Sequence, residues 1–321
     1  MTRSLFAAIV ALAGLAAAAD IAAQNYPTRP IRFIVPFPTG GATDVMARTL
    51  GQQLHASMGQ AVVVENRVGA SGAIGSEFVS KSAPDGHTVL LGTITTHGTS
   101  PAVNPKLPYS PSRDFTAISL LAHAPLVLLV NPDVPARSLQ DFLRISKAGR
   151  AIPYGSNGSG AYNHLAMELL KGLTKINILH VPYKGAGPAI NDLIAGQITA
   201  GAHDIAGVSA HIRSGRLRAL AVAAKQRIAG MDIPTFAESG IADFEVTAWY
   251  ALFGPPAIPA DILGRLHDAV AKGVASPEMQ KVLANIGAIP VGGSPEELDA
   301  FVRAEVERWS RVAKAGNISL D

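Results

Sequence analysis

The chain has 321 residues, of which 48% are hydrophobic and 16% charged; this is enough apolar sequence for the cores of one or two domains and excludes a disordered chain. Its formal net charge of +3 is too mild to indicate nucleic-acid binding, although a slightly basic protein can favour anionic solutes. The absence of cysteine excludes disulfides, thiolate metal sites, a catalytic cysteine and a lipid-bearing cysteine.

Residues 1–23 have the pattern of a secretory signal peptide. Arg3 supplies the positive charge, residues 5–19 the apolar stretch, and a run ending at residues 21–23 the cleavage region. We place the cut before Gln24, with Ala19 as the alternative. A retained membrane anchor is the competing interpretation, but the fifteen apolar residues fall short of the ~20 that a spanning helix needs. The sequence therefore predicts an exported, periplasmic protein.

The first strand-to-helix junction is rich in glycine and proline. The strand-like run IRFIV at 31–35 ends in PFPTGGATD at 36–44, which enters a helical pattern through Thr43 and Asp44. Adjacent glycines allow tight turning and close backbone approach, and Thr or Asp can cap the helix. Something small and anionic can therefore lie there. Strands and helices continue to alternate up to residue 93, which predicts an α/β sheet with parallel pairs.

Two long strand-like runs interrupt this alternation. Residues 118–130 (ISLLAHAPLVLLV) are almost continuously apolar around a central proline, which indicates one long strand, or two strands broken at a bend, rather than a helix. Residues 244–256 (FEVTAWYALFGPP) form the second run, in which Trp249 and Tyr250 are assigned to packing or to a hinge. We interpret the two runs as crossings between two lobes.

Between these runs the chain repeats a strand, a loop and a helix. The first helix is expected to stop at Gly172, and the second to open with Pro188 and close with Gly196. Right-handed crossovers place the strand-to-helix junctions at one edge of the sheet. Three loops therefore converge there: 155–160, 184–187 and 203–206. Ligands of open α/β sheets bind at this carboxyl edge.

The rest of the chain is mainly helical, at 259–273, 277–285 and 295–315. The last of these helices carries an apolar stripe that predicts core packing: Leu298, Phe301, Val302, Val306 and Trp309. The expected fold is α/β with two lobes, each a mostly parallel sheet flanked by helices. We assign residues 24–122 and 250–321 to one lobe and 123–249 to the other, with a cleft between them.

The common catalytic and cofactor motifs are missing. The nine histidines show no HExxH spacing, and neither Ser71 nor Ser156 has the G-x-S-x-G context of a nucleophile elbow. No Gly-Lys pair exists for a phosphate-binding P-loop, and the glycine loops lack the G-x-G-x-x-G spacing of dinucleotide sites. We therefore expect no catalytic residue, no metal and no cofactor.

What remains is a glycine-rich loop followed by a helix in each expected lobe. Free N–H groups and the helix dipole make such a junction a seat for a carboxylate. Micromolar binding needs ~8 kcal/mol, whereas the dipole supplies ~0.3–1 kcal/mol and each hydrogen bond to a charged group ~1.5–3 kcal/mol. Several N–H groups from both lobes would then be required. The competing interpretation is that these glycines form ordinary β–α turns.

Three charged side chains near these loops each have two interpretations. Asp44 either caps its helix or pairs with Arg48, or it accepts a hydrogen bond from a ligand or a bridging water. Asp204, at a strand end on the expected cleft edge, is either structural or receives a ligand amine or hydroxyl. Lys184 is either a solvated loop charge or an anion partner.

The segments IRFIVPFPTGGATDVMAR, VENRVGASGAIG, GSNGSGAYNHLAMELL and VPYKGAGPAINDLIAGQI closely resemble the Bug family, the periplasmic solute-binding proteins of tripartite tricarboxylate transporters. The similarity runs from about residue 26 to the C-terminus in the same order. It implies a type II periplasmic-binding-protein fold with two crossovers, closing on a small carboxylate. In that family, N–H groups of the two glycine loops hold the proximal carboxylate, often with bridging waters; the matching positions here are 38–44 and 155–160.

The candidate ligand-binding residues combine the two loops with a few neighbours: Phe37, Pro38, Thr39, Gly40, Gly41, Ala42, Thr43, Asp44, Thr96, Gly155, Ser156, Asn157, Gly158, Ser159, Gly160, His164, Lys184, His203 and Asp204. Phe37 and Pro38 would shape the wall, and Lys184, His203 and Asp204 would tune the distal end. His203 departs from the family, which often has an aromatic or apolar residue before this aspartate, so the resemblance leaves the ligand open.

The function expected is that of a non-enzymatic, monomeric binding protein that captures a small organic carboxylate and delivers it to the permease subunits of a membrane transporter. Two alternatives remain. The closed protein could instead dock on a two-component sensor, or the same cleft could hold an enzyme site that turns over the bound acid.

Overall fold

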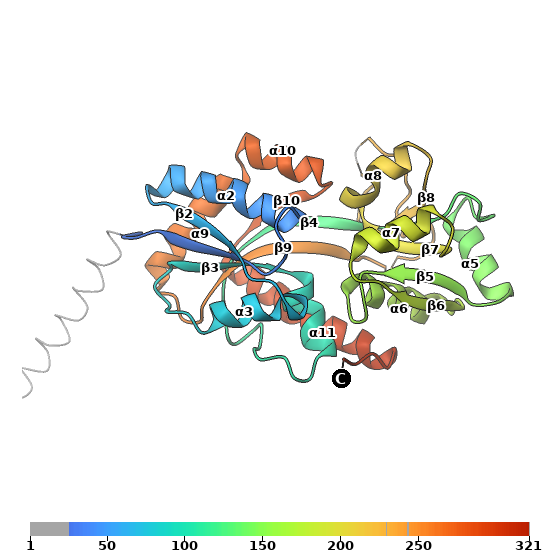
Figure 1. The fold of residues 1–321 in the computed structure, drawn as a ribbon, viewed down its shortest axis with the longest axis horizontal. Coiled ribbons are helices and arrows are strands. Elements are labelled where there is room, and N and C mark those ends of the chain that lie inside the picture. Colours follow the sequence, from blue (N-terminus) through green and yellow to red (C-terminus); the bar gives the residue numbers. More distant parts are fainter. Residues whose placement is uncertain (1–25, 229, 243, 321) are drawn as a thin grey trace, which may run out of the picture.

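The computed structural model describes residues 26–228, 230–242 and 244–320, so the predicted signal peptide lies outside the described residues. The strands form a 10-stranded sheet, with helices grouped at the two ends of its two long strands (Figure 1). Its order is β2 (Val62–Asn66), β1 (Ile31–Val35), β3 (Thr88–Thr93), β9 (Thr247–Gly254), β4 (Thr116–Val130), β7 (Ala200–Asp204), β5 (Ile152–Ser156) and β6 (Ile178–Pro182), while β8 (Arg218–Val222) and β10 (Ile289–Gly293) also pair with β4. No helix in these ranges is long and apolar enough to span a membrane.

The strands at one end of the sheet are parallel, as the alternation predicts. Strand β1 pairs in parallel with both β2 and β3, and helices α2 (Ala42–Met58) and α3 (Ala73–Ser80) connect them. Four of the five β1 side chains are fully buried: Ile31, Phe33, Ile34 and Val35. This burial explains why every residue of β1 except Arg32 is apolar, because crossover helices cover parallel sheets on both faces.

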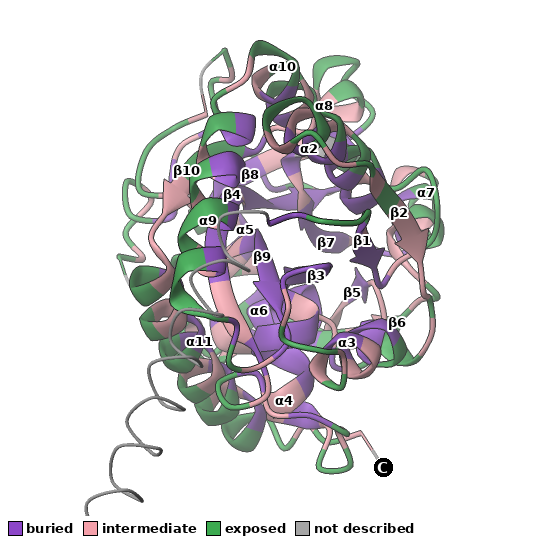
Figure 2. Cartoon of the chain, turned by 90° about the vertical axis from the view of Figure 1, so that its left-hand side faces the viewer, coloured by how far each residue is buried: buried purple, intermediate pink, exposed green. Residues whose placement is uncertain are grey.

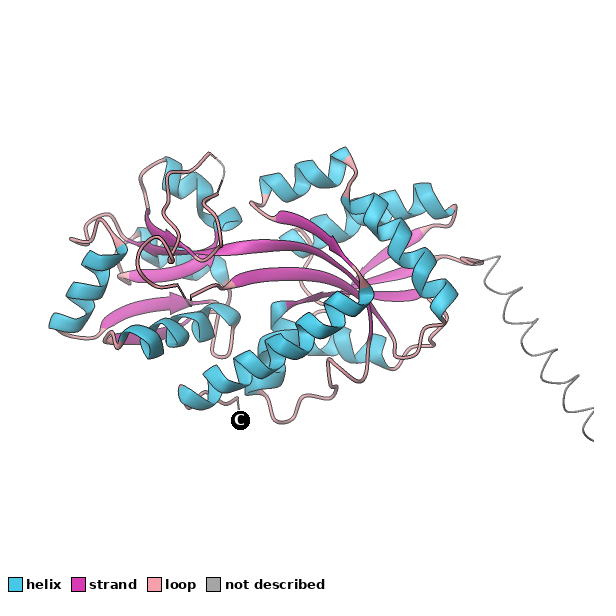
Figure 3. Ribbon diagram, turned by 180° about the vertical axis from the view of Figure 1, so that it is seen from behind, coloured by secondary structure: helices cyan, strands magenta, loops and turns pink. Residues whose placement is uncertain are grey.

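The predicted crossings are strands β4 and β9, and β4 is one long strand rather than two. Between Thr116 and Pro125 it pairs antiparallel with β9, and from Leu126 to Val130 it pairs with β7 and β8. The change of partners follows Pro125, which has no N–H to donate to a ladder. Figure 3 shows the two strands running side by side through the middle of the molecule.

The strands at the other end also form the predicted β–α units. Strand β5 pairs in parallel with β6 and β7. Alternate side chains of β4 enter different cores here: Leu128 packs with the α6 side, whereas Val127 and Leu129 pack with Leu193 and Val208. Both faces are therefore covered, and the middle of the sheet is buried (Figure 2). The covering helices are α5 (Leu139–Ala148), α6 (Tyr162–Thr174), α7 (Ala186–Ile194) and α8 (Ile205–Arg213).

Two predicted helix boundaries in this region are wrong. Helix α6 continues through Gly172 and ends when Lys175 adopts a left-handed conformation with φ 58°. A helical glycine costs only about 1 kcal/mol relative to alanine, so it does not have to end a helix. Helix α7 begins at Ala186, two residues before Pro188. Proline is tolerated there because the N–H groups of the first turn have no helical acceptor. Gly196 does follow the helix, with φ 73°.

The C-terminal helices α10 (Pro277–Asn285) and α11 (Pro295–Ala315) have the predicted boundaries, and α9 (Ala260–Val274) differs by one residue at each end. Strand β10 was not predicted. The expected stripe of α11 packs on β4: Leu298, Val302 and Trp309 are buried. Short helices η1 (Ala70–Gly72), η2 (Thr95–Thr99) and α4 (Ser100–Val103) fill the connections after β2 and β3.

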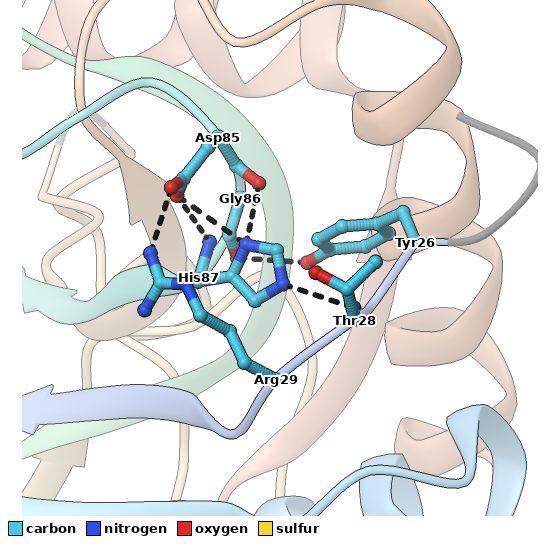
Figure 4. Close-up of polar contacts among 6 residues, drawn as sticks. All are labelled: Tyr26, Thr28, Arg29, Asp85, Gly86 and His87. Atoms are coloured by element: carbon cyan, nitrogen blue, oxygen red, sulfur yellow. Dashed lines mark hydrogen bonds and ion pairs between the residues drawn. The ribbon is translucent and has the colours of Figure 1, made fainter. Parts of the chain in front are cut away.

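The first described residues are tied to the start of β3 (Figure 4). Tyr26 donates its hydroxyl to the Gly86 carbonyl at 2.7 Å, and Arg29 pairs with Asp85 at 2.7 Å. The Thr28 N–H donates to Nε2 of His87 at 3.2 Å, which requires the neutral ring with its proton on Nδ1, 2.9 Å from the Asp85 carbonyl. These contacts secure the chain before β1 begins.

Candidate functional site

The loop after β1 is organised by one buried carboxylate. Asp44 is 2% exposed and accepts hydrogen bonds from the Gly40 N–H, the Arg48 guanidinium and the Asn66 amide, each at 3.0 Å. The hydrogen bond from Arg48, opposed by burial, lowers the Asp44 pKa to about 2. Asn66 also donates to the Phe37 carbonyl at 3.0 Å. The structure therefore favours the Arg48 pairing for Asp44, which acts as a brace within the loop.

Helix α2 begins without a side-chain cap, contrary to the prediction that Thr43 or Asp44 caps it. Its N-cap residue is Gly41, which is exposed, has φ −76° and carries no capping group. Gly40 donates its N–H to Asp44, which removes one expected amide. The N–H groups of residues 42–44 lie in the first turn, where a helix offers no acceptor. These amides and those of Thr39 and Gly41 have no acceptor among the described residues.

The loop after β5 is braced by its own side chains. Asn157, Gly158 and Gly160 donate their N–H groups to Asn163 Oδ1, Ser156 Oγ and His164 Nδ1, each at 3.1 Å. Ser156 is fully buried and also lies 2.6 Å from His180 Nε2. The prediction that these three amides face a ligand is therefore wrong.

Helix α6, which follows this loop, also lacks a side-chain cap. Its N-cap residue is Ala161, whose own N–H donates to the Gly158 carbonyl. Within the described chain the Ser159 N–H has no intrachain acceptor, and residues 162–164 supply first-turn amides. The unpaired amides at this junction are therefore those of Ser159 and of the helix start.

His164, a candidate ligand-binding residue, supports the loop instead. Its ring stacks on His180 with 3.7 Å between centroids and 8° between planes, while Nδ1 accepts from Gly160. Burial lowers the pKa of both imidazoles to about 4. Both rings are consequently neutral at pH 7.

The candidates His203 and Asp204 are neighbours on β7, where successive side chains point to opposite faces of the sheet. His203 pairs with Val127 and Asp204 with Leu126, so the two side chains lie on opposite faces of the sheet. His203 is buried on the α7 side near Leu193, and the prediction that it tunes the same end of the ligand as Asp204 is wrong.

Thr96 and Lys184 also differ in their surroundings. Thr96 is fully buried and its hydroxyl bonds within the η2 turn, to Thr93; the structure therefore gives it a structural role. Lys184 is exposed beside Gly185, whose N–H donates to the Asn157 carbonyl. This contact confirms that the loops at 155–160 and 184–187 converge.

Asp204, which is half-buried at the end of β7, pairs with a buried tyrosine that sequence reasoning missed. The Tyr162 hydroxyl, in the first turn of α6, donates to Asp204 Oδ1 at 2.5 Å. Burial raises the Asp204 pKa to about 6, and the Tyr162 hydrogen bond opposes that shift. Burial and then the Asp204 charge raise the pKa of Tyr250 on β9. Tyr250 follows Trp249 in strand β9, so the two side chains lie on opposite faces of the sheet. This alternation was the signal in the sequence that could have separated the role of Tyr250 from that of Trp249.

Replacing Asp204 by asparagine is expected to stabilise the protein at pH 8. The folded-state pKa of about 6 lies above the ordinary 3.8, so the folded state binds more protons and the carboxyl's stability contribution is lost as pH rises through 6. Removing the ionised carboxylate should raise the unfolding free energy by about 1–3 kcal/mol at pH 8 and by much less at pH 4. Chemical denaturation at both pH values measures this.

A matched control is Asp192→Asn, because Asp192 also accepts a tyrosine hydroxyl, from Tyr183 at 2.8 Å. This variant should not reproduce the pH-dependent gain. Destabilisation of Asp204→Asn at pH 8, or a gain of equal size at pH 4, would contradict the assignment.

The two loops occupy the inward ends of their strands. In Figure 1, β1 and β5 both run toward the middle of the molecule, where α2 and α6 begin. The loop just before α6 lies close to α4, which belongs to the β1 end of the molecule. The backbone of Gly160 is so near Val103 that an added Cβ would lie 2.9 Å from its side chain. Among the described residues no group of three or more His, Asp or Glu side chains is arranged to hold a metal.

Comparisons with solved structures place this arrangement in a class. The periplasmic binding protein BugD is 32% identical with a TM-score of 0.78, covering 92% of this chain and 99% of its own. MatC from Rhodopseudomonas palustris, solved with bound malate, is 33% identical with a TM-score of 0.78 and covers 89% and 99%. An R. palustris protein solved with adipate is 34% identical with a TM-score of 0.81 and covers 92% and 99%. The fold is that of periplasmic binding proteins.

Sequence comparison defines the family within this class. Protein BugT of Bordetella pertussis is 37% identical over 317 residues, 98% of this chain and 97% of BugT. Residues 46–318 match the family described as the tripartite tricarboxylate transporter family receptor, TctC. The chain belongs to this family, which confirms the resemblance and the fold class expected from the sequence.

Proposed function

We propose that this chain is a periplasmic receptor that captures a small organic carboxylate between two lobes and delivers it to the membrane subunits of a tripartite transporter. The observation that carries the proposal is that α2 and α6 both begin without a side-chain cap at the inward ends of their strands. Helices α5, α10 and α11 are capped by Ser138, Ser276 and Ser294, whereas α3, α7, α8 and α9 also lack a side-chain cap. What distinguishes α2 and α6 is that each follows a glycine-rich loop and that their open starts come from opposite ends of the molecule.

Uncapped helix starts suit a carboxylate. Each leaves N–H donors unpaired and adds the positive end of a helix dipole. Hydrogen bonds to a charged group contribute about 1.5–3 kcal/mol each, so three or four amides from the two helices can reach the ~8 kcal/mol of micromolar affinity. The relatives solved with malate and adipate support a dicarboxylic acid as the ligand class.

The proposed lobes are residues 24–122 with 250–321, and 123–249. The partner change of β4 after Pro125 supports the first boundary, because the strand leaves β9 for β7 and β8 there. The start of β9 at Thr247 supports the second. Only β4 and β9 would then connect the sheets of the two lobes, which suits a hinge.

Nothing in the loop geometry favours catalysis. The Ser156–His180 pair resembles a nucleophile and its base, but Ser156 is fully buried, and its hydroxyl donates to the Gly158 carbonyl at 3.0 Å. We assign this pair to loop support. The family relatives are named as receptors or binding proteins.

Calorimetry against malate, adipate, citrate, amino acids and aromatic acids tests the function. At least one acid should bind with a Kd of about micromolar or tighter, and the diamide of that acid should bind at least about 100-fold more weakly, because it lacks the charge that the amides recognise. Failure of every acid to bind below about millimolar would contradict the proposal. Conversion of the bound acid during the titration would instead indicate an enzyme.

A further inference from the structure

A groove lies between the second half of α6 and the end of α11, on the far side of α6 from its glycine loop. Its volume is about 780 Å³, and residues 168–176 line one side while residues 308–316 line the other. The C-terminal residues that the structure describes, up to Leu320, run past this groove without covering it. The Leu320 N–H donates to the Val103 carbonyl at 2.7 Å, and its side chain packs near Gly160 instead.

The bottom of the groove is apolar and accessible. Leu169, Leu173, Ile176 and Val312 line it, and Leu173 is 44% exposed. A Cβ at Gly172 would meet no atom of the described residues within 4 Å, so this turn of α6 is open. Leu169 and Val312 are partly buried and Ile176 is buried, so Leu173 is the exposed large apolar side chain of the groove. An exposed leucine in an apolar hollow between two helices suits a site that accepts another helix.

The rim of the groove is basic. Four cationic side chains line it, from Lys171, Lys175, Arg308 and Arg311. The Arg308 side chain is 31% exposed and lies 3.5 Å from the carboxylate of Glu305, so it is already paired within α11. Glu168 supplies the carboxylate among the lining residues. That carboxylate already accepts a hydrogen bond from the Tyr154 hydroxyl at 3.0 Å and lies 3.4 Å from Lys171. Arg311 pairs with Glu307, but both side chains are mostly exposed, at 67% and 74%. Exposed pairs of this kind contribute little and exchange readily.

We propose that this α6–α11 groove docks an acidic amphipathic helix of a partner protein. Apolar side chains on one face of such a helix would fill the space over Leu169 and Leu173. Flanking glutamates would meet the three more exposed cations, Lys171, Lys175 and Arg311. A flat anionic membrane suits the surface less well, because the apolar residues lie in a hollow between the helices. The inference does not depend on the proposed carboxylate function, since the groove uses the opposite end of α6.

The test uses the full mature chain and a synthetic helical peptide of about 15 residues, with leucines at i, i+3, i+4 and i+7 and glutamates elsewhere. Fluorescence anisotropy should show binding that weakens with salt. Lys171→Glu and Arg311→Glu together should reduce the affinity at least about tenfold, and Leu173→Gln should also weaken it.

Arg303→Glu is the matched control. Arg303 lies on the same helix, its side chain is 64% exposed, and it pairs with Asp299 at i,i+4 spacing as Arg311 does with Glu307. This variant should bind the peptide within about twofold of the original protein, apart from a small long-range charge effect.

Four results would overturn the proposal: no binding of the glutamate peptide, equal binding of its lysine counterpart, equal losses from Arg303→Glu and Arg311→Glu, or anionic vesicles that bind where the peptide does not. Concentration-dependent self-association that is lost in Arg311→Glu would also overturn it, because the groove would then serve a second copy.

Discussion

Replacing Gly41 by aspartate is expected to reduce carboxylate affinity at least about 100-fold while leaving the protein folded. Gly41 is the N-cap of α2, with φ −76° and no atom closer than 3.6 Å to an added Cβ, so a side chain fits without strain. An aspartate there accepts hydrogen bonds from the amides of N2 or N3. It would occupy the proposed seat and repel the ligand, at a loss of about 2.8 kcal/mol or more.

Two controls separate charge, capping and general effects. Gly41→Asn caps the same amides without a charge and should lose less affinity than Gly41→Asp. Gly149→Asp places the same charge at a glycine of the α5 end that also has open space, and it should bind normally. Thermal denaturation should show Gly41→Asp to be as stable as the original, because aspartate and glycine N-caps differ by only a few tenths of a kcal/mol. An affinity within about threefold of the original would remove residues 38–44 from the site.

Gly158 is a poorer position for such a test. Its φ is +137°, and an added Cβ would lie 3.2 Å from the Tyr183 carbonyl. A larger residue there strains the loop whether or not a ligand binds. Lost binding at Gly158 would therefore not separate a ligand contact from a misfolded loop.

Glu305→Ala is expected to lower the unfolding free energy by about 3–5 kcal/mol, because it leaves buried donors without an acceptor. Oε2 of Glu305 accepts the indole N–H groups of both Trp249 and Trp309, each at 2.9 Å. Both indoles are fully buried, and Glu305 is 7% exposed. The alanine would orphan two donors and open a cavity between β9 and α11. Urea denaturation followed by tryptophan fluorescence measures the loss.

Glu305→Gln should have an intermediate effect, since its amide oxygen still accepts at least one indole. Glu307→Ala, on the same helix but with a side chain 74% exposed, should change stability by less than about 0.5 kcal/mol. If Glu305→Ala is no more destabilising than Glu307→Ala, the two indoles have found other acceptors and the carboxylate does not join α11 to the sheet.

Residues that follow strong local patterns were predictable. Helix α11 begins where Ser294 and Glu297 form a reciprocal capping box, and its stripe of apolar residues packs as expected. The long strand β4 could be recognised because its two faces enter two cores and both need apolar side chains. Strand β10 could not, because its residues IPVGG include a proline and two glycines, and only pairing with β4 makes them a strand.

The sequence predicted where the candidate site lies, but not which hydrogen bonds its residues form. Glycine-rich turns before helices identified both loops, because such turns can leave backbone amides exposed at a helix start. Three amides of the loop after β5 donate to side chains of the same region instead of remaining free. Whether they do so depends on the conformations of Ser156, Asn163 and His164, which local sequence patterns do not determine. The pairing of Tyr162 with Asp204 joins positions 42 residues apart, and only the folded sheet brings them together.

The open starts of α2 and α6 consist of backbone N–H groups, which every amino acid except proline carries. Under the proposed function, a mutation other than to proline cannot delete the atoms that bind the acid; it can only cover them or reshape the surrounding wall. Duplicated genes could therefore diverge toward new cargo through a few wall substitutions while the shared anionic group stays recognised. Relatives about one-third identical to this chain, solved with malate and with adipate, show the diversity that such inheritance would permit.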